Sequence, residues 1–235
     1  MTIGCEETSL ARTRGLRSAT LLLVESDLGR RATLPVALGT SYVVTTAATA
    51  DEALEEAGAS VFDVAVLDAT VVGRVLPRIV RVLRGHWPGV RLVVTALRGD
   101  LRARHYSTTL GCDALLGRSA SACLVLDCVD VPLARGPRRP RFDRNVGRAI
   151  DLMARDVTHL LDVAALASAT GVPLPHLAER FRVTTGLTVR EYVTRVRVAV
   201  AEQFLKDTDL GVGTFAELLG FADADELTAL VPAPR

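Results

Sequence analysis

The feature that most restricts the fold of this chain is a series of helical patterns in its C-terminal third. An apolar face with helical spacing begins at Val163, and the side chain of Asp162 can cap the start of that helix. Gly171 suits the left-handed turn that ends a helix. Leu177 and Phe181, four residues apart, mark the buried side of a second short helix. Two short helices joined by a tight turn that contains glycine predict a helix-turn-helix unit.

The patterns that follow predict a second unit of the same kind. A long helix is expected over residues 189–206, and a shorter turn unit runs from Asp209 to Phe221. In this order and spacing, residues 145–231 resemble the tandem helix-turn-helix domain of the AraC family of bacterial transcription regulators. An isolated helix-turn-helix pattern also occurs in ordinary helical bundles, so the spacing of the two units is what favours this family. The motifs that carry the resemblance are Asp162–Val172, His176–Phe181, Thr185–Tyr192 and Phe215–Phe221.

In the N-terminal half, short apolar runs alternate with helical patterns. Because the runs are rich in Val and Leu without polar alternation, they predict strands of a parallel sheet that is buried on both faces. The clearest helix opens with Thr49 and Glu52, at capping-box spacing, and is expected to end at Gly58. Five such strand-helix units predict a flavodoxin-like α/β domain. The five strand candidates are residues 21–24, 42–45, 64–67, 92–95 and 114–116.

Polar residues stand where ligands bind in such a fold, beyond the carboxyl ends of the strands. Asp68 ends the third strand, and Glu25 and Asp27 follow the first. This arrangement resembles the receiver domain of two-component response regulators. The resemblance implies that Asp68 accepts a phosphoryl group, supplied by a sensor kinase. It also implies that Glu25 is one acid that holds Mg²⁺, and Asp27, one residue beyond the second acid position of the family, is a weaker candidate. By the same resemblance, Thr95 and Arg118 would contact the phosphate.

Three features depart from the receiver pattern. Ser26 stands where the family has a second acid, although Mg²⁺ prefers an anionic oxygen. Arg118 stands where the family has a lysine, and a planar guanidinium does not simply replace a compact ammonium. The segment after Asp68 lacks the usual Met-Pro pair. Since phosphoryl transfer depends on the placement of metal and cation, we expect weak or absent phosphorylation. The alternative is that Asp68 only caps a strand end.

Charge is distributed unevenly along the chain. Residues 1–130 carry equal numbers of acidic and basic groups, whereas residues 131–200 carry a net charge of +6 and residues 201–235 a net charge of −5. The basic block contains the first helix-turn-helix unit, and the acidic block contains the second. The predicted segments are a flexible tail at 1–18, a receiver-like domain at 19–130, an Arg- and Pro-rich linker at 131–144 and the helix-turn-helix domain at 145–235.

The charge pattern also indicates how DNA would be bound. Basic side chains neutralise phosphates, and side chains on the second helix of a unit reach base edges. In the second unit, Asp223, Asp225 and Glu226 stand where a DNA-facing surface would carry basic groups. We therefore expect this unit to fold without reading DNA. The candidate DNA-binding residues, all in the first unit and the long helix, are His176, Glu179, Arg180, Arg182, Arg195 and Arg197.

Composition argues against several other classes of protein. The apolar fraction of 49% is high enough for packed cores. No run of about 18 apolar residues is present and the first residues have no apolar centre, so neither a membrane span nor a signal peptide is expected. The four cysteines fit neither a disulfide framework nor a zinc spacing, which is typical of a cytoplasmic protein. Without a Gly-rich phosphate loop, a Cys/His pair or a nucleophile elbow, no enzyme is predicted.

The whole pattern predicts a cytoplasmic bacterial transcription regulator that binds double-stranded DNA and forms a homodimer. In this hypothesis, occupancy of the receiver-like pocket changes dimerisation or the exposure of the DNA-binding face. Mg²⁺ in the receiver-like pocket is the one cofactor expected. The alternative is an interaction protein with little DNA affinity of its own, which works without phosphorylation and binds other regulators or RNA polymerase.

Overall fold

The computed structural model describes residues 18–39, 42–129, 143–155, 157, 163–207 and 212–231. Several predictions fall on residues outside these ranges. They concern the tail before residue 18, the linker up to residue 142, the helix cap at Asp162 and the start of the second turn unit at Asp209. In the described part of the chain, none of the helices is both long and apolar enough to cross a membrane.

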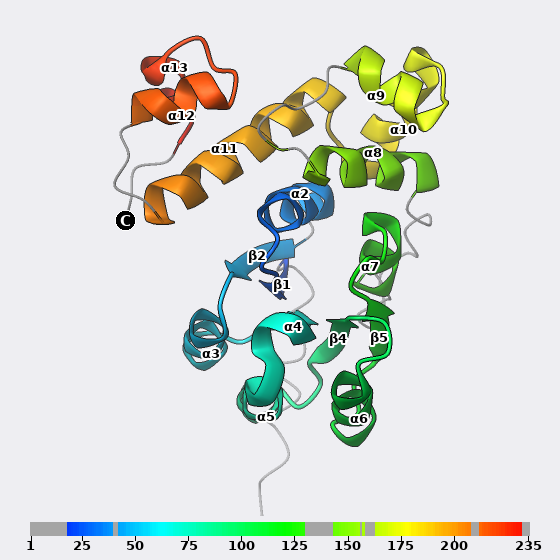
Figure 1. Cartoon of the computed structure of the whole chain (residues 1–235), viewed down its shortest axis with the longest axis vertical. Coiled ribbons are helices and arrows are strands. Elements are labelled where there is room, and N and C mark those ends of the chain that lie inside the picture. Colours follow the sequence, from blue (N-terminus) through cyan, green and yellow to red (C-terminus); the bar gives the residue numbers. More distant parts are fainter. Residues whose placement is uncertain are drawn as a thin grey trace, which may run out of the picture.

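A five-stranded parallel sheet forms the centre of the N-terminal domain (Figure 1). Its order is β2-β1-β3-β4-β5, and every neighbouring pair of strands is parallel. The five predicted strands are confirmed, and this order is the flavodoxin-like order of the receiver fold. The strands are β1 (Ala19–Val24), β2 (Tyr42–Ala47), β3 (Val64–Asp68), β4 (Arg91–Ala96) and β5 (Ala114–Gly117).

Helices cover both faces of this sheet, which explains the unbroken Val and Leu runs of its strands. Leu21 and Leu23 point to the face covered by α2 (Leu28–Leu38) and α7 (Ala122–Val129). Leu22 and Leu67 belong to the apolar cluster of the opposite face. The elements on that face are α3 (Ala50–Ala59), α4 (Ala69–Val72), η3 (Gly73–Val75), α5 (Leu76–His86) and α6 (Leu101–Thr109).

Capping signals visible in the sequence set the ends of α3. The hydroxyl of Thr49 accepts a hydrogen bond from the N–H of Glu52 at 3.2 Å, and Oε2 of Glu52 accepts one from the N–H of Ala48 at 2.8 Å. These contacts satisfy N–H groups that the first turn of a helix leaves free. The prediction that this helix ends at Gly58 is wrong by one residue, because the helix continues to Ala59.

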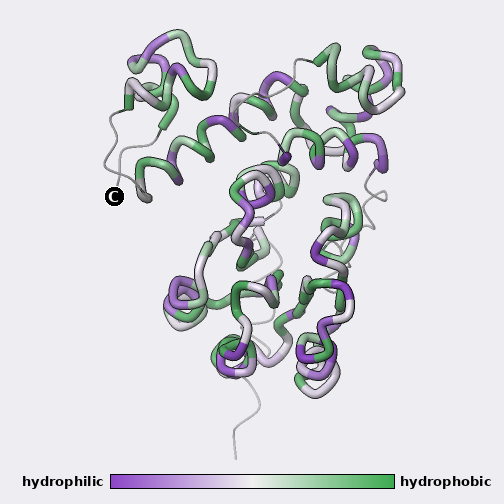
Figure 2. Tube along the Cα trace, in the orientation of Figure 1, coloured by the Kyte–Doolittle hydropathy of each residue, from purple (hydrophilic) through white to green (hydrophobic). Residues whose placement is uncertain are grey.

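In the described part of the chain, six helices form the C-terminal domain. Gly171 and Gly186 follow α9 and α10 with left-handed φ angles of 72° and 75°. The ring of Phe181 on α10 packs edge-on against Tyr192 on α11, with 5.0 Å between ring centroids. Both hydrophobic and hydrophilic residues occur along α11 (Figure 2). The buried residues Tyr192, Val196 and Val200 recur every four positions, so they lie on one side of the helix. The helices are α8 (Arg144–Arg155), α9 (Val163–Thr170), α10 (Leu174–Thr185), α11 (Val189–Asp207), α12 (Val212–Leu218) and α13 (Ala224–Leu230).

Helix α2 belongs to both domains, because it lies between the sheet and helices α8 and α11 (Figure 1). A Cβ atom at Gly29 on α2 would overlap the carbonyl oxygen of Ala154 on α8. The buried hydroxyl of Tyr192 donates to the carbonyl oxygen of Thr33 on α2 at 2.6 Å. Asp151 on α8 accepts a hydrogen bond from the first N–H of α7 at 2.9 Å. One apolar cluster therefore runs from the sheet into the C-terminal helices.

Candidate receiver pocket and nucleic-acid interface

The receiver-like pocket lies at the carboxyl edge of the sheet. Asp68 ends β3 and is fully buried, and Glu25 follows β1 with 3% of its surface exposed. Val24 pairs with Leu67 in the sheet register, so Glu25 and Asp68 occupy the next positions on adjacent strands. Thr95 on β4 pairs with Asp68 from the other side. The structure thus brings together three of the residues that the sequence predicted for this pocket.

Asp68 is held by contacts from within the protein. Its Oδ1 accepts hydrogen bonds from the backbone N–H of Thr70 at 2.9 Å and from the Thr70 hydroxyl at 2.8 Å. Its Oδ2 lies at ion-pair distance, 3.2 Å, from Nε of Arg118, but accepts no hydrogen bond from the described residues. Nη2 of Arg118 donates to Oγ of Ser26 at 2.8 Å. Arg118 therefore neutralises the carboxylate of Asp68 and joins it to the loop after β1.

A second guanidinium group neutralises Glu25. Nε of Arg30 donates to Oε2 of Glu25 at 3.1 Å, and the N–H of Asp27 donates to Oε1 at 3.1 Å. Burial raises the pKa of Glu25, opposed by the Asp27 hydrogen bond and by Arg30, while the charge of Asp68 raises it further. The carboxylate of Asp27 serves another purpose, because it caps α2 by accepting from the N–H of Arg30 at 2.8 Å.

These contacts do not suit a magnesium ion. Mg²⁺ is bound through carboxylate oxygens and water, yet Glu25 and Asp68 already face guanidinium groups and Asp27 is a helix cap. The charges of Arg30 and Arg118 would repel a divalent cation placed between them. Within the described ranges, no group of three or more His, Cys, Asp or Glu side chains could hold a metal. The positive charge of this pocket comes from the protein itself.

Arg31 connects the pocket to the C-terminal domain. Its side chain is buried, and its Nη1 donates to the carbonyl oxygens of Glu25 at 2.9 Å and Ser26 at 3.0 Å. Its Nε donates to Oε1 of Gln203 on α11 at 2.8 Å. Since Ser26 also accepts from the arginine that pairs with Asp68, polar contacts run without a break from the pocket to α11.

In the C-terminal domain, α10 buries one side and exposes the other. Leu177 and Phe181 are fully buried. His176, Glu179 and Arg182, three of the predicted DNA-binding residues, are exposed on the same helix. A helix that is packed on one side and free on the other can enter a major groove without losing its own packing. The geometry of the first unit is therefore compatible with reading DNA.

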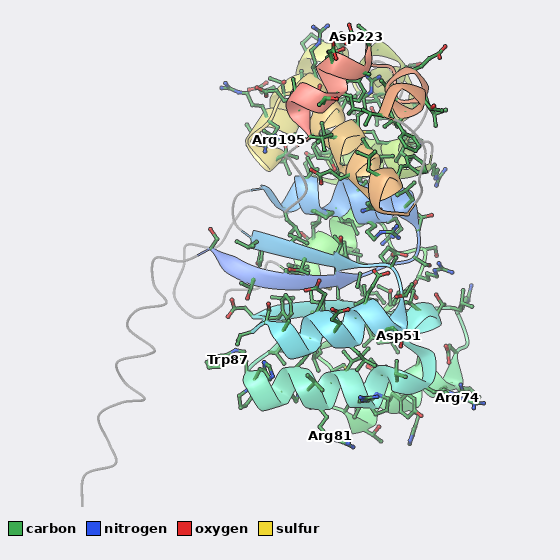
Figure 3. All side chains as sticks on the ribbon, turned by 90° about the vertical axis from the view of Figure 1, so that its left-hand side faces the viewer. Asp51, Arg74, Arg81, Trp87, Arg195 and Asp223 are labelled. Carbon is green, nitrogen blue, oxygen red and sulfur yellow. The ribbon has the colours of Figure 1, made fainter. Side chains whose placement is uncertain are left out.

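The other three predicted DNA-binding residues differ in their surroundings. Arg180 is exposed, and its Nη1 lies 3.5 Å from Oδ2 of Asp143. Arg195 is exposed on α11 (Figure 3). Nη1 of the half-buried Arg197 donates to the carbonyl oxygen of Gly220 at 3.3 Å, so this side chain joins α11 to the turn between α12 and α13. Of these three side chains, Arg195 is the one best placed to reach a phosphate.

Two acidic groups of the second unit stabilise its own helix. Oδ1 of Asp223 accepts from the N–H of Glu226 at 2.8 Å, and Oε2 of Glu226 accepts from the N–H of Ala222 at 2.8 Å. This is a capping box at the start of α13. Asp225 takes no part in this capping box and is exposed. The exposed acids still place negative charge on this surface, but two of them are explained by the helix that they begin.

A family model described as a helix-turn-helix domain matches residues 166–231. These residues contain the exposed α10, the long α11 and the second unit. The C-terminal domain is therefore a helix-turn-helix domain, as predicted. The match includes Leu177, Phe181 and the Phe215–Phe221 segment, whose spacing predicted the two helix-turn-helix units.

Two curated relatives come from Streptomyces, and both are described as AraC-like transcription regulators. The protein of Streptomyces antibioticus is 27% identical over 161 residues, which cover 65% of this chain and 52% of that protein. The protein of Streptomyces lividans is 27% identical over 149 residues, which cover 61% of this chain and 47% of that protein. The chain therefore spans about half the length of the curated relatives it matches.

Solved structures that are similar to the N-terminal domain are receiver domains and response regulators. The non-phosphorylated HemR receiver domain of Leptospira biflexa is 21% identical, with a TM-score of 0.44, and the match covers 51% of this chain and 98% of that chain. A response regulator of Chloroflexus aurantiacus is 24% identical, with a TM-score of 0.43, and the match covers 51% of this chain and 100% of that chain.

Sequence reasoning missed three residues that shape the pocket and its connection to the helix-turn-helix domain. Arg30 and Arg31 lie on the predicted first helix, where exposed arginines are common, and their carboxylate and carbonyl partners are set by the turn before that helix. Gln203 lies 172 positions from Arg31. The sequence carried no signal for these pairings, because spacing along the chain does not fix the direction of a long arginine side chain.

Proposed function

We propose that this protein is a DNA-binding transcription regulator that docks on DNA through the first unit of its helix-turn-helix domain. The observation that carries the proposal is α10, whose buried Leu177 and Phe181 anchor it while His176, Glu179 and Arg182 face solvent. The Streptomyces relatives, described as AraC-like transcription regulators, support it. Because its target is chromosomal DNA, we place the protein in the cytoplasm, where it acts by binding and not by catalytic turnover.

We further propose that the receiver-like domain acts without phosphoryl transfer from a sensor kinase. Arg118 already neutralises the carboxylate of Asp68, and Arg30 neutralises that of Glu25. Arg31 links the loop after β1 to α11 through its hydrogen bond to Gln203. A partner that displaces Arg118 would change contacts that reach the helix-turn-helix domain. This partner would be a second copy of the chain or RNA polymerase. Its binding would alter the affinity for DNA through α11.

One observation favours a second candidate function. The second unit exposes Asp223, Asp225 and Glu226, and negative charge opposes docking on phosphates. If the repulsion between these acids and the phosphates outweighs the attraction from the first unit, the protein has little DNA affinity. It is then an interaction protein that binds other regulators through the acidic unit.

A mobility shift on genomic fragments, carried out at two salt concentrations, separates the two functions. We expect a sequence-specific complex that weakens as salt rises. Arg182→Ala should weaken it about tenfold and reduce the salt dependence by about one phosphate contact, while Arg182→Lys, which keeps the charge, should retain most of the affinity. Asp225→Ala should leave the complex unchanged or strengthen it. The absence of any specific complex at low salt would favour the interaction protein instead.

A further inference from the structure

The receiver-like domain carries a strongly basic surface at its α5 and α6 end. The segment between Asp68 and Asp100 contains six arginines and no acidic residue. Continuing through α6, the exposed arginines of this end are Arg74, Arg78, Arg81, Arg98, Arg102 and Arg104. We name this set the basic face. The net charge of the domain does not reveal the basic face, because acidic residues elsewhere, above all on α3, balance the charge of these arginines.

Three of these arginines form a straight stripe along η3 and α5. Arg74, Arg78 and Arg81 are spaced by four and three residues, which places them on one side of a helix over about 10 Å. The opposite side, with Leu76 and Leu83, is buried against the sheet. Figure 3 shows Arg81 on the side of α5 that faces away from α3, and Arg74 beyond the end of α5 where η3 lies. The stripe therefore faces solvent along its whole length.

The stripe is not balanced by acids. Among the residues that the structure describes, none of the six arginines has a carboxylate within 4.0 Å. The acids that flank this stretch in the sequence are used elsewhere. Asp68 pairs with Arg118 at 3.2 Å, Asp100 caps α6, and Asp113 accepts from the N–H of Leu92 at 2.8 Å. Arg84 shows the contrast, because it donates to the carbonyl oxygens of Leu110 and Gly111 and so joins α5 to α6.

We propose that the basic face binds the phosphate backbone of duplex DNA. A protein partner would need an apolar centre on this surface, with charges at the rim. The α5 stripe has no exposed large hydrophobic side chain, and the exposed Leu97 and Leu101 lie to one side, at the start of α6. The α5 stripe carries positive charge along its length without an exposed large hydrophobic side chain, which fits a repeating row of phosphates, bound by charge neutralisation and without reading sequence.

The inference goes beyond the proposed function, because the basic face and the helix-turn-helix domain lie at opposite ends of the molecule (Figure 1). One chain would therefore contact two DNA segments, or two parts of one bent segment. The helix-turn-helix domain would supply sequence specificity, and the basic face would supply affinity that depends on salt.

The experiment compares full-length variants on a duplex of about 30 base pairs without an operator. Arg74→Glu, Arg78→Glu and Arg81→Glu are combined in one variant. The matched control carries Lys at the same three positions and keeps the charge. For the Glu variant we expect binding about a hundredfold weaker near 0.1 M salt and a salt dependence smaller by about three phosphate contacts. The Lys variant should behave like the wild type. In a second assay, protein bound to an immobilised duplex is tested for capture of a second, free duplex. The wild type and the Lys variant should capture it, and the Glu variant should capture much less.

Different failures of this experiment have different meanings. If the wild type binds no duplex at low salt, both this inference and the proposed function are overturned. If Arg182→Ala weakens specific binding while the Glu variant matches the wild type on both duplexes, only the basic face is refuted. If the Glu variant changes self-association without DNA and leaves duplex binding unaltered, the face binds an acidic surface of another copy, and the DNA assignment is wrong.

Discussion

Each of the two buried carboxylates of the pocket is paired with a guanidinium group, and this pairing limits the reactivity of the carboxylates. Arg118 lies 3.2 Å from Asp68, and Arg30 lies 3.1 Å from Glu25. A carboxylate that is buried and paired is a poor nucleophile toward a phosphoryl donor, because the approaching phosphate has no free metal site to neutralise its own charge. The pocket lies at the same edge of the sheet as the phosphorylation site of a receiver domain, but its positive charges are the guanidinium groups of Arg30 and Arg118.

The first prediction at this scale concerns phosphorylation. With a small phosphodonor and Mg²⁺, we expect less than stoichiometric labelling after many minutes, because the carboxylates of Glu25 and Asp68 are already paired with guanidinium groups. Intact-mass measurement checks this, with Asp68→Asn as the control for labelling elsewhere. Stoichiometric labelling within minutes that Asp68→Asn removes would show that Arg118 and Arg30 move aside and that the pocket still transfers phosphate.

Half of this pocket could be predicted from residue types alone. Asp68 ends an apolar strand and Arg118 follows another, so the sheet geometry brings them to one edge. The departures at Ser26 and Arg118 already indicated a weakened metal site. The pairing of Arg30 with Glu25 could not be read, because it depends on how the turn before α2 aims a long side chain. That direction is set by the cap at Asp27 and not by spacing along the chain.

At the scale of helices and strands, α2 is the element that the fold depends on most. It meets the sheet on one side and α8 and α11 on the other, and Gly29 permits the close approach to Ala154. We expect Gly29→Ala to lower the free energy of unfolding by about 2 kcal/mol, because the added methyl group must push the two helices apart. Chemical denaturation measures this loss.

Gly58→Ala is the matched control, because Gly58 lies inside α3 with open space where a Cβ would go. There the same substitution should stabilise the protein by about 0.5 to 1 kcal/mol, since alanine is the better helix former. Equal effects at both glycines would mean that the contact between α2 and α8 does not persist in solution.

The elements themselves were predictable, but their partners were not. Periodicity and caps identify helices such as the one that Thr49 begins, because those signals are local. The same holds for α13, where the Asp223 and Glu226 spacing is that of a capping box, although we interpreted both acids only as charge opposing DNA. Amphipathic spacing shows that a helix buries one face, but not against which element. The packing of α2 on α11 therefore had no sequence signal.

At the scale of the whole molecule, the shared core predicts that both domains unfold together. Trp87, the single tryptophan, reports on the N-terminal domain through its fluorescence, whereas helical circular dichroism reports on both domains. We expect the two signals to follow one denaturation curve, because separating the domains would expose the apolar cluster around α2. In the Gly29→Ala variant, the weakened contact should move the two curves apart.

Two separate transitions in the wild type would contradict this expectation, and they would mean that the linker joins independent domains. A variant such as Tyr192→Phe then measures one bond of the interface, since it removes the hydroxyl that donates to Thr33 and leaves a buried carbonyl oxygen without that partner.

The close fit of α2 also restricts how such a chain can evolve. A lineage that exchanged this receiver-like domain for another would lose the glycine at position 29, the carbonyl group at position 33 and the arginine at position 31, each of which meets a particular atom of the C-terminal helices. Two of these contacts end on backbone carbonyl oxygens, those of Ala154 and Thr33, which any residue at those positions supplies, so the restriction falls on Gly29 and Tyr192. Arg31 and Gln203 meet through their side chains, so a change at one of them is tolerated only where the other accommodates it.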